Sequence, residues 1–330
     1  MGYVAMALLA LQFGLQPILY KEFAANARYP SVLVIACEVC KLVVAAVVLL
    51  LSGRAGVVLR AWRWRDALAA SGLPACTYAV QNVLVQLSYQ HLPPIVFNLV
   101  NQTKLLWTAL FVFWLLGKRF SVQQCIAMLM LLAAAVLLAV AKEPHSNTTT
   151  AASTSAVSFQ LGLLPVLVAS MLSGFGAATT QRSMQLHQRD ATLVTMELSV
   201  FGILFLLASM ASTAIGSGTG AAGTGSVDGL LLFFSWERLL VLFDGWDRRT
   251  LLPVLANACG GLLVGAVTKY VGGVLKSFAL VAGIAFTAFL ESSLYGAVLP
   301  TDVWVAAALV TVSLVVYSAY PYVDTKAKQA

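Results

Sequence analysis

Charged residues are scarce in this sequence, and that scarcity excludes an ordinary soluble domain. Only 10% of the 330 residues are charged, whereas soluble domains carry about 25%. Apolar residues make up 60%, and the mean hydropathy is +0.88. The composition therefore predicts a membrane protein with several spans. The net charge of +7 does not indicate nucleic-acid binding, because most basic residues lie in short loops between apolar runs.

Histidine and cysteine are also few, which makes catalytic, metal-binding and disulfide roles less expected. The three histidines lie near the ends of apolar runs or between them, and no zinc-protease, serine-hydrolase or kinase motif occurs in the sequence. The five cysteines lie in or beside apolar runs, so we expect no disulfide framework and interpret Cys37-x-x-Cys40 as packing. We therefore expect neither an enzyme nor a bound metal or cofactor.

Apolar runs long enough to cross a bilayer occur ten times. The predicted spans cover residues 2–20, 31–52, 67–90, 93–116, 120–141, 159–185, 190–213, 250–270, 273–296 and 301–320. The fold class expected is therefore an all-α membrane protein with ten transmembrane helices.

Two polar segments divide the chain. A Ser/Thr/Ala-rich connector at 142–158 separates a first five-helix half, 1–141, from a second, 159–330. A Gly/Ser/Thr-rich segment begins a loop or insertion at about 214–249. An odd number of spans in each half gives the halves opposite orientations, which predicts an inverted five-plus-five repeat.

The loops between the predicted spans indicate an orientation. Basic residues on the side of the two termini are Arg54, Arg60, Arg63, Arg65, Lys118, Arg119, Arg189, Lys326 and Lys328. This moderate excess favours cytosolic termini. A glycosylation sequon, Asn147-Thr148-Thr149, falls in the 142–158 connector, which the same orientation makes lumenal.

Two lysines, Lys104 and Lys276, interrupt otherwise uncharged apolar stretches. A lysine near the bilayer centre costs about 2.5–3.5 kcal/mol, so it normally faces a cavity, a partner or an anion. Each lies in the fourth span of its half, so the repeat predicts symmetry mates at one site between the halves. Pairing with a carboxylate stays open as the alternative, for Lys276 through Glu197 or Glu291.

Other polar residues inside the spans extend this candidate site. Two ammonium groups match a ligand with about two negative charges, and aromatic rings with nearby amides are suited to a heterocyclic base. The candidate substrate-binding residues are Lys104, Lys276, Tyr78, Asn82, Phe97, Asn101, Gln102, Thr195, Glu197 and Ser199. Glu38 and Lys41, three residues apart, predict an intrahelical ion pair with a structural or gating role, and Lys269 is a third structural or gating candidate.

Several of these blocks resemble a known family. They are Glu38-Val-Cys-Lys41, Pro74-Ala-Cys-Thr-Tyr78-Ala-Val-Gln-Asn82, Val96-Phe97-Asn98-Leu99-Val100-Asn101-Gln102-Thr103-Lys104, Ser173-Gly174-Phe175, and Lys269-Tyr270 followed by Lys276-Ser-Phe278. They resemble the nucleotide-sugar transporters of the CMP-sialic acid, UDP-galactose and UDP-N-acetylglucosamine class, in the drug/metabolite transporter superfamily. The resemblance implies exchange of a cytosolic nucleotide sugar for a lumenal nucleoside monophosphate across the Golgi or endoplasmic reticulum membrane. It also implies that Lys104 and Lys276 contact phosphate, and that Tyr78, Asn82 and Phe97 line the nucleoside pocket.

Departures from the family pattern indicate a branch. Phe97 replaces a Tyr, Val194-Thr195-Met-Glu197 replaces Arg-Asn-x-Gln, and Gly272-Gly273 replaces Asp-Asn. These changes resemble a plant-type branch that includes a transporter of UDP-N-acetylhexosamines, so we expect a UDP-sugar. Lys326 and Lys328 resemble a dilysine retrieval signal, which leaves Golgi and endoplasmic reticulum both open.

Other interpretations remain at this point. One is a transporter of the same fold for another phosphorylated metabolite. Another is a membrane-embedded transferase, which would need an acid/base or metal pair near a mouth of the protein, whereas Glu197 and Glu291 both lie inside predicted spans. A non-transporting scaffold is disfavoured by the two intramembrane lysines. The expected partners are a nucleotide sugar, a nucleoside monophosphate and the lipid bilayer, but not nucleic acid; association with a second copy or with a glycosyltransferase stays open.

Overall fold

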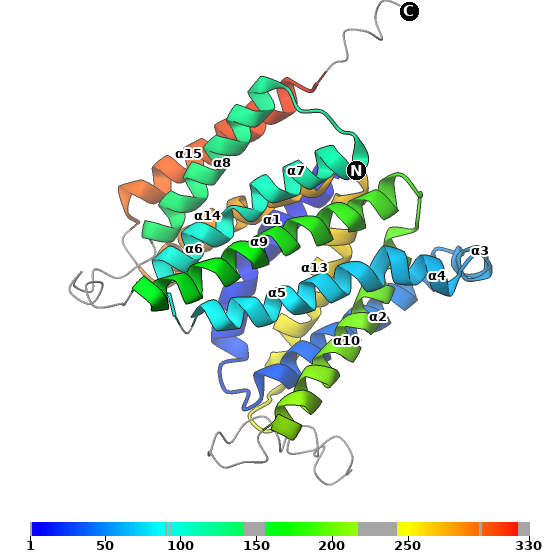
Figure 1. The fold of residues 1–330 in the computed structure, drawn as a ribbon. Helices are drawn as coiled ribbons and strands as arrows, with labels where there is room; N and C mark the ends of the chain where they lie inside the picture. The colour runs from blue at the N-terminus through cyan, green and yellow to red at the C-terminus, as the bar shows by residue number, and fades with distance from the viewer. Residues whose placement is uncertain are drawn as a thin grey trace, which may run out of the picture. The chain divides into compact units, whose positions relative to one another are not determined.

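A computed structural model describes residues 2–89, 91–92, 94–141, 156–216, 243–296 and 299–322. Within these ranges every regular element is a helix (Figure 1), which confirms the predicted all-α class. The sequon, most of the predicted connector, the glycine-rich segment from residue 217 onward and the two C-terminal lysines lie outside the described residues.

The elements follow the predicted order along the chain. They are α1 (Gly2–Phe23), α2 (Pro30–Leu51), α3 (Ala55–Arg60), α4 (Trp64–Ala67), η1 (Leu68–Gly72), α5 (Leu73–Tyr89), α6 (Pro94–Gln102), α7 (Lys104–Leu116), α8 (Val122–Ala141), α9 (Ala156–Gln185), α10 (Ala191–Gly216), η2 (Arg248–Thr250), α13 (Leu251–Tyr270), α14 (Gly273–Tyr295) and α15 (Thr301–Ala319).

Nine helices or helix runs in the described part of the chain are long and apolar enough to cross a membrane. The span predicted at 93–116 differs, because it divides at Thr103 into α6 and α7. The Thr103 hydroxyl donates to the Val100 carbonyl oxygen at 2.6 Å, and the Thr103 amide bonds to the same oxygen. Such tight local bonds compete with the regular helical ladder. Ten uninterrupted helices are therefore not confirmed.

The chain forms two compact units. The larger unit contains Met1–Gly14, Thr77–Gln188 and Val267–Ala330, and the smaller contains Leu15–Cys76 and Arg189–Ala266. Each unit takes segments from both predicted halves of the chain. The division into halves at 1–141 and 159–330 therefore stays a prediction.

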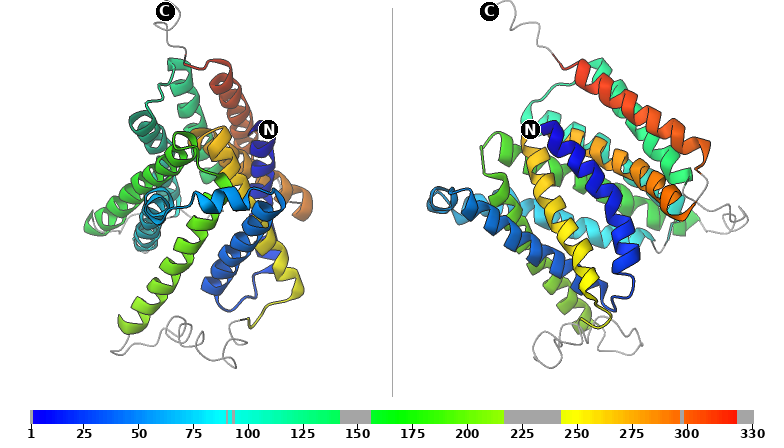
Figure 2. Two further views of the ribbon diagram at one scale, coloured as in Figure 1. Left: turned by 90° about the vertical axis from the view of Figure 1, so that its right-hand side faces the viewer. Right: turned by 180° about the vertical axis from the view of Figure 1, so that it is seen from behind.

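The larger unit contains α6 to α9, α14, α15 and most of α5. Helix α8 packs along α15, and α14 contacts α7, α8, α9 and α15 (Figure 2). Helix α9 comes very close to α7 at Gly174, where an added Cβ would lie 2.7 Å from the backbone nitrogen of Thr108. Only glycine permits that approach, a common device where helices pack inside a membrane.

The smaller unit is built on the pair α2 and α10, with η1 against α10. Helices of equal rank in the two predicted halves pack together in both units. Helices α2 and α10 are the second spans, α8 and α15 the fifth, and α7 and α14 belong to the fourth.

The contact at Gly174 generates a stability prediction. Gly174→Ala should lower stability by about 1–3 kcal/mol, because the new methyl group meets backbone that cannot move aside. The measurement is the melting temperature of the purified protein in detergent. Gly56→Ala is the control, since an added Cβ there has no neighbour within 4 Å. Equal melting temperatures for the two variants would contradict the predicted packing.

Candidate functional site

The two intramembrane lysines lie on neighbouring helices of the larger unit. Helix α7 begins at Lys104, and Lys276 lies in the first turn of α14. The helices are in contact, and a Cβ on Gly273 would lie 3.3 Å from the Thr108 side chain, one turn beyond Lys104. Each lysine therefore lies within about one helical turn of a contact between α7 and α14.

Neither lysine has a counterion in the described ranges. No carboxylate there lies within 4.0 Å of Lys104 or Lys276, and neither ammonium donates a hydrogen bond. Glu291 lies about 22 Å further along α14 than Lys276, at 1.5 Å per residue. Glu197 forms its ion pair with Arg189. The alternative in which a carboxylate neutralises each lysine therefore finds no support.

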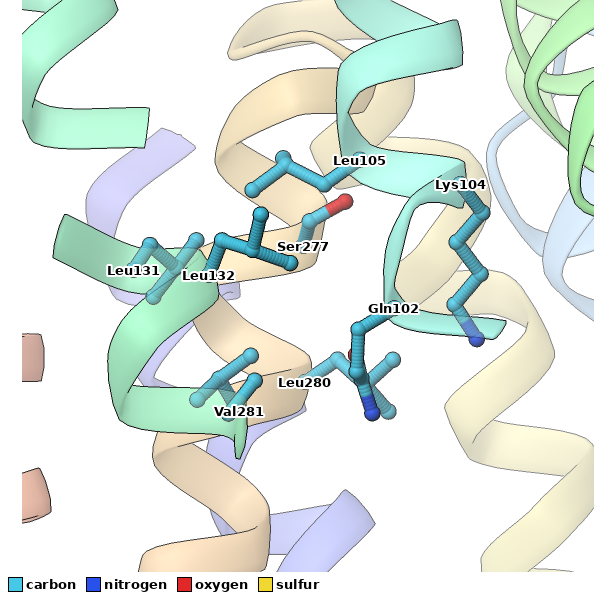
Figure 3. A pocket seen from close by; sticks show the side chains of 9 residues that line it. Gln102, Lys104, Leu105, Leu131, Leu132, Ser277, Leu280 and Val281 are labelled. Atoms are coloured by element: carbon cyan, nitrogen blue, oxygen red, sulfur yellow. The ribbon is translucent and has the colours of Figure 1, made fainter. Parts of the chain in front are cut away.

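Lys104 also lines a small cavity in the larger unit. Figure 3 shows the Lys104 ammonium and the Gln102 amide extending in the same direction, away from Leu131 and Leu132. Ser277 adds a hydroxyl, and the remaining wall is aliphatic. The cavity measures about 10 Å³, enough for one water. Pockets for drug-sized ligands measure about 300–1,000 Å³, so this cavity is far too small for such a ligand.

A buried glutamine fixes the start of the helix that carries Lys276. Gly272 has φ +107° and turns the chain between α13 and α14. The Gly273 amide donates to Gln181 Oε1 at 2.8 Å, which caps α14 with a neutral acceptor. Gln181 Nε2 donates to Gln185 Oε1 at 2.9 Å, and Gln185 Nε2 donates to the Lys269 carbonyl at 2.9 Å. This chain of amides holds the last turn of α13 and the first turn of α14 in place.

The residues predicted to line a nucleoside pocket also belong to the larger unit, but they differ in how far they are buried. Tyr78 is half-buried, and its ring lies against Gly176 of α9, where a Cβ would be 3.0 Å from ring carbons. Asn82 is exposed one turn further along α5, and Asn101 is half-buried near the end of α6.

Phe97 is fully buried and packs with Leu92 and Val166. A base can therefore stack on this ring only after the cluster rearranges, and the nucleoside role of Phe97 stays a prediction.

The predicted candidates on α10 lie in the smaller unit, where Glu197 is the centre of a buried network. Its carboxylate accepts hydrogen bonds from Trp62 Nε1 at 2.9 Å, from Ser71 Oγ at 2.6 Å and from the Arg189 guanidinium. Arg189 also donates to the Asp66 carbonyl oxygen. The network ties the loop before α4 to the start of α10.

Thr195 and Ser199, on the same helix as Glu197, are buried. The Thr195 hydroxyl donates to the Ala191 carbonyl oxygen at 2.8 Å. The Ser199 hydroxyl has no hydrogen-bond partner within the described residues. A substrate role for Thr195, Glu197 and Ser199 stays a prediction.

The predicted ion pair on α2 is confirmed. Lys41 Nζ lies 2.7 Å from Glu38 Oε1, and both side chains are mostly buried. The Lys41 stem covers Gly261 of α13, where a Cβ would lie 2.5 Å from Lys41 Cε. Glycine at this position lets the charged pair pack against a helix backbone, while its gating role stays a prediction.

Together these features describe a multi-pass helical membrane protein in which two buried lysines on contacting helices have no counterion among the described residues. The model of the nucleotide-sugar transporter family matches residues 1–318, and the chain belongs to that family. The resemblance inferred from the motifs is thereby confirmed. This is a family of transporters rather than of enzymes.

The chain is also similar to individual proteins. The UDP-N-acetylglucosamine transporter ROCK1 of Arabidopsis thaliana is 35% identical over 322 residues, which cover 98% of this chain and 93% of the relative. The UDP-N-acetylglucosamine transporter of Rattus norvegicus is 25% identical over 241 residues, covering 73% and 68%. A protein crystal structure aligns with a TM-score of 0.63 at 16% identity, covering 96% of this chain and 97% of that chain, which shows a common fold.

The Glu197 network generates a second prediction. Glu197→Ala should destabilise the protein by about 3–5 kcal/mol, because it leaves the Arg189 charge buried without its carboxylate. Thermal unfolding in detergent measures the effect. Asp244→Ala is the matched control, since the Arg28–Asp244 pair is solvent-exposed and worth at most about 1 kcal/mol. Similar losses in both variants would show that Glu197 does not have this structural role.

Proposed function

We propose that the protein exchanges a cytosolic UDP-sugar for a lumenal nucleoside monophosphate. The observation that carries this proposal is the pair Lys104 and Lys276, two neighbouring cations without a counterion in the described part of the chain. Two like charges inside a low-dielectric helix bundle repel strongly, so an anion that contacts both gains affinity from each.

The charge of the ligand follows from the charge of the site. A nucleotide sugar carries two negative charges on its diphosphate, and a nucleoside monophosphate carries about two near neutral pH. Exchange of one for the other moves little net charge across the membrane and leaves the lysines neutralised in both directions. Helix α14 adds its positive N-terminal end beside Lys276, which also favours phosphate.

The relatives support uracil and an N-acetylhexosamine. ROCK1 is named as a UDP-N-acetylglucosamine transporter and aligns over nearly the whole chain. We assign the nucleoside to Tyr78, Asn82 and Phe97. Asn101 and Gln102 would hold the sugar near the phosphates. Thr195, Glu197 and Ser199 on α10 stay candidate substrate-binding residues.

Alternating access is the transport mechanism we infer. The cavity beside Lys104 admits only a water, so loading requires a rearrangement. Packing of equal-rank helices, such as α8 with α15 and α2 with α10, is what an inverted repeat would produce. The loop charges support cytosolic termini, and the family resemblance supports the Golgi or endoplasmic reticulum membrane.

The two-lysine site is tested by substitution. Lys104→Ala and Lys276→Ala should each reduce UMP-inhibitable uptake of UDP-N-acetylglucosamine into proteoliposomes by at least about 100-fold, because each removes a charge that binds phosphate. Lys→Arg at either position should retain part of the uptake. Arg249→Ala, at an exposed arginine, is the control with full uptake. Normal uptake by either alanine variant, with protein amounts matched, would rule out the two-lysine site.

Counterflow tests the substrate and the exchange partner. Proteoliposomes preloaded with UMP should accumulate UDP-N-acetylglucosamine, whereas empty or CMP-loaded vesicles should accumulate far less. Competition by UDP-galactose and CMP-sialic acid then ranks the sugars and bases. Accumulation of a simple sugar phosphate, unaffected by UMP or UDP, would instead support a transporter of another phosphorylated metabolite.

A further inference from the structure

The connector between α2 and α4 has an unusual surface. Helix α3, within this connector, has no buried residue. Val57 is 75% exposed and Leu59 is 58% exposed, and Trp62 and Trp64 are exposed as well. Contact of these apolar side chains with water is unfavourable. A loop surrounded only by water would therefore not be expected to expose so many of them.

The same segment carries unpaired positive charge. Arg60, Arg63 and Arg65 have no ion-pair partner within the described ranges, whereas Arg54 pairs with Asp190 at 2.6 Å. Three free guanidinium groups therefore alternate with exposed aliphatic and indole side chains. A partner that fits this surface must offer both anionic groups and an apolar phase.

The position of the connector indicates which partner that is. One apolar span ends at Leu51 and the next begins at Trp64, so both ends of the connector lie where spans leave the membrane. Tryptophan is enriched at that boundary, and basic residues there attract anionic lipids. Phosphates of the headgroup layer and the acyl chains beneath it supply both kinds of contact at one depth.

The connector is also fixed to the helices of its own unit. Trp62 donates to Glu197 on α10, and its ring contacts Trp64 with centroids 6.1 Å apart. Trp64 in turn contacts Phe201, also on α10, at 6.0 Å. The exposed side chains are therefore held in a defined arrangement rather than on a free loop.

We propose that residues 55–65 form a binding surface for the headgroups of anionic phospholipids. Arg60, Arg63 and Arg65 bind lipid phosphate, while Val57, Leu59 and Trp64 insert among the upper acyl chains. Binding depends on the net negative charge of the headgroup layer, so a zwitterionic lipid binds more weakly. This assignment does not depend on which substrate the protein transports.

The experiment uses the full-length protein, delipidated in a non-ionic detergent. Native mass spectrometry measures retention of phosphatidylinositol and of phosphatidylcholine at increasing lipid concentration. The variants are Arg60→Gln/Arg63→Gln, the charge-retaining Arg60→Lys/Arg63→Lys, and Arg248→Gln/Arg249→Gln. The last pair removes two exposed arginines that begin another span, outside the connector. Melting temperatures verify that each variant is folded.

The wild type should retain phosphatidylinositol in preference to phosphatidylcholine. Arg60→Gln/Arg63→Gln should raise the apparent dissociation constant for phosphatidylinositol on the order of tenfold, from the contribution of each basic residue near an anionic surface. The lysine pair should bind like the wild type, and the Arg248/Arg249 variant should change less than about twofold. Equal loss in both glutamine variants, or equal retention of the two lipids by the wild type, would overturn the proposal.

Discussion

Two lysines on contacting helices, Lys104 on α7 and Lys276 on α14, set the main electrostatic constraint on the larger unit. Two cations on contacting helices, without a carboxylate beside them in the described ranges, would separate unless other contacts held their helices. Those contacts are neutral. Gln181 caps the start of α14, and Gly174 lets α9 pack directly on the backbone of α7. Packing and amide hydrogen bonds therefore hold the charges in place without neutralising them, and the proposed anion site is built on that feature.

In the smaller unit, by contrast, buried charged side chains form ion pairs. Glu38 lies within 2.7 Å of Lys41, and Glu197 accepts from Arg189 as well as from an indole and a hydroxyl. Polar groups in a membrane protein generally satisfy each other in this manner, since lipid offers no alternative partner. Lys104 and Lys276 depart from this rule, and the contrast within one chain is what makes them informative.

Much of the local architecture could be predicted from composition and spacing. Apolar runs of about 20 residues predict ten spans, and nine helices or helix runs in the described part of the chain are long and apolar enough to cross a membrane. The three-residue spacing of Glu38 and Lys41 predicts the ion pair that they form. The break at Thr103 could not be predicted, because the apolar run contains neither Pro nor Gly there and a threonine is normally tolerated within a helix. Periodicity describes side-chain faces, whereas this break depends on one hydroxyl bonding to one carbonyl.

Part of the candidate site could also be predicted from the sequence. A lone lysine in an apolar stretch is conspicuous, so both members of the pair could be found from the sequence. Gln181 was missed because its partner, Gly273, is a backbone amide far along the chain. Glu197 was identified as a candidate, but its hydrogen-bond network was missed because Trp62 and Ser71 lie in another part of the sequence. The four-residue spacing of Gln181 and Gln185 places them on one face of a helix, but it does not indicate their bonds to Gly273 and Lys269. Long-range hydrogen bonds leave no periodic pattern in the sequence.

Three helices pass from one compact unit into the other, and each has an irregularity near its crossing. Helix α1 crosses after Gly14 and contains Pro17. The run into α5 crosses after Cys76 and is preceded by the π-helical turn η1, and α13 crosses beside Gly265. Proline, glycine and π-helical turns are the usual sites of helix bending. Each of these helices can therefore bend at such a point without disturbing the packing inside either unit.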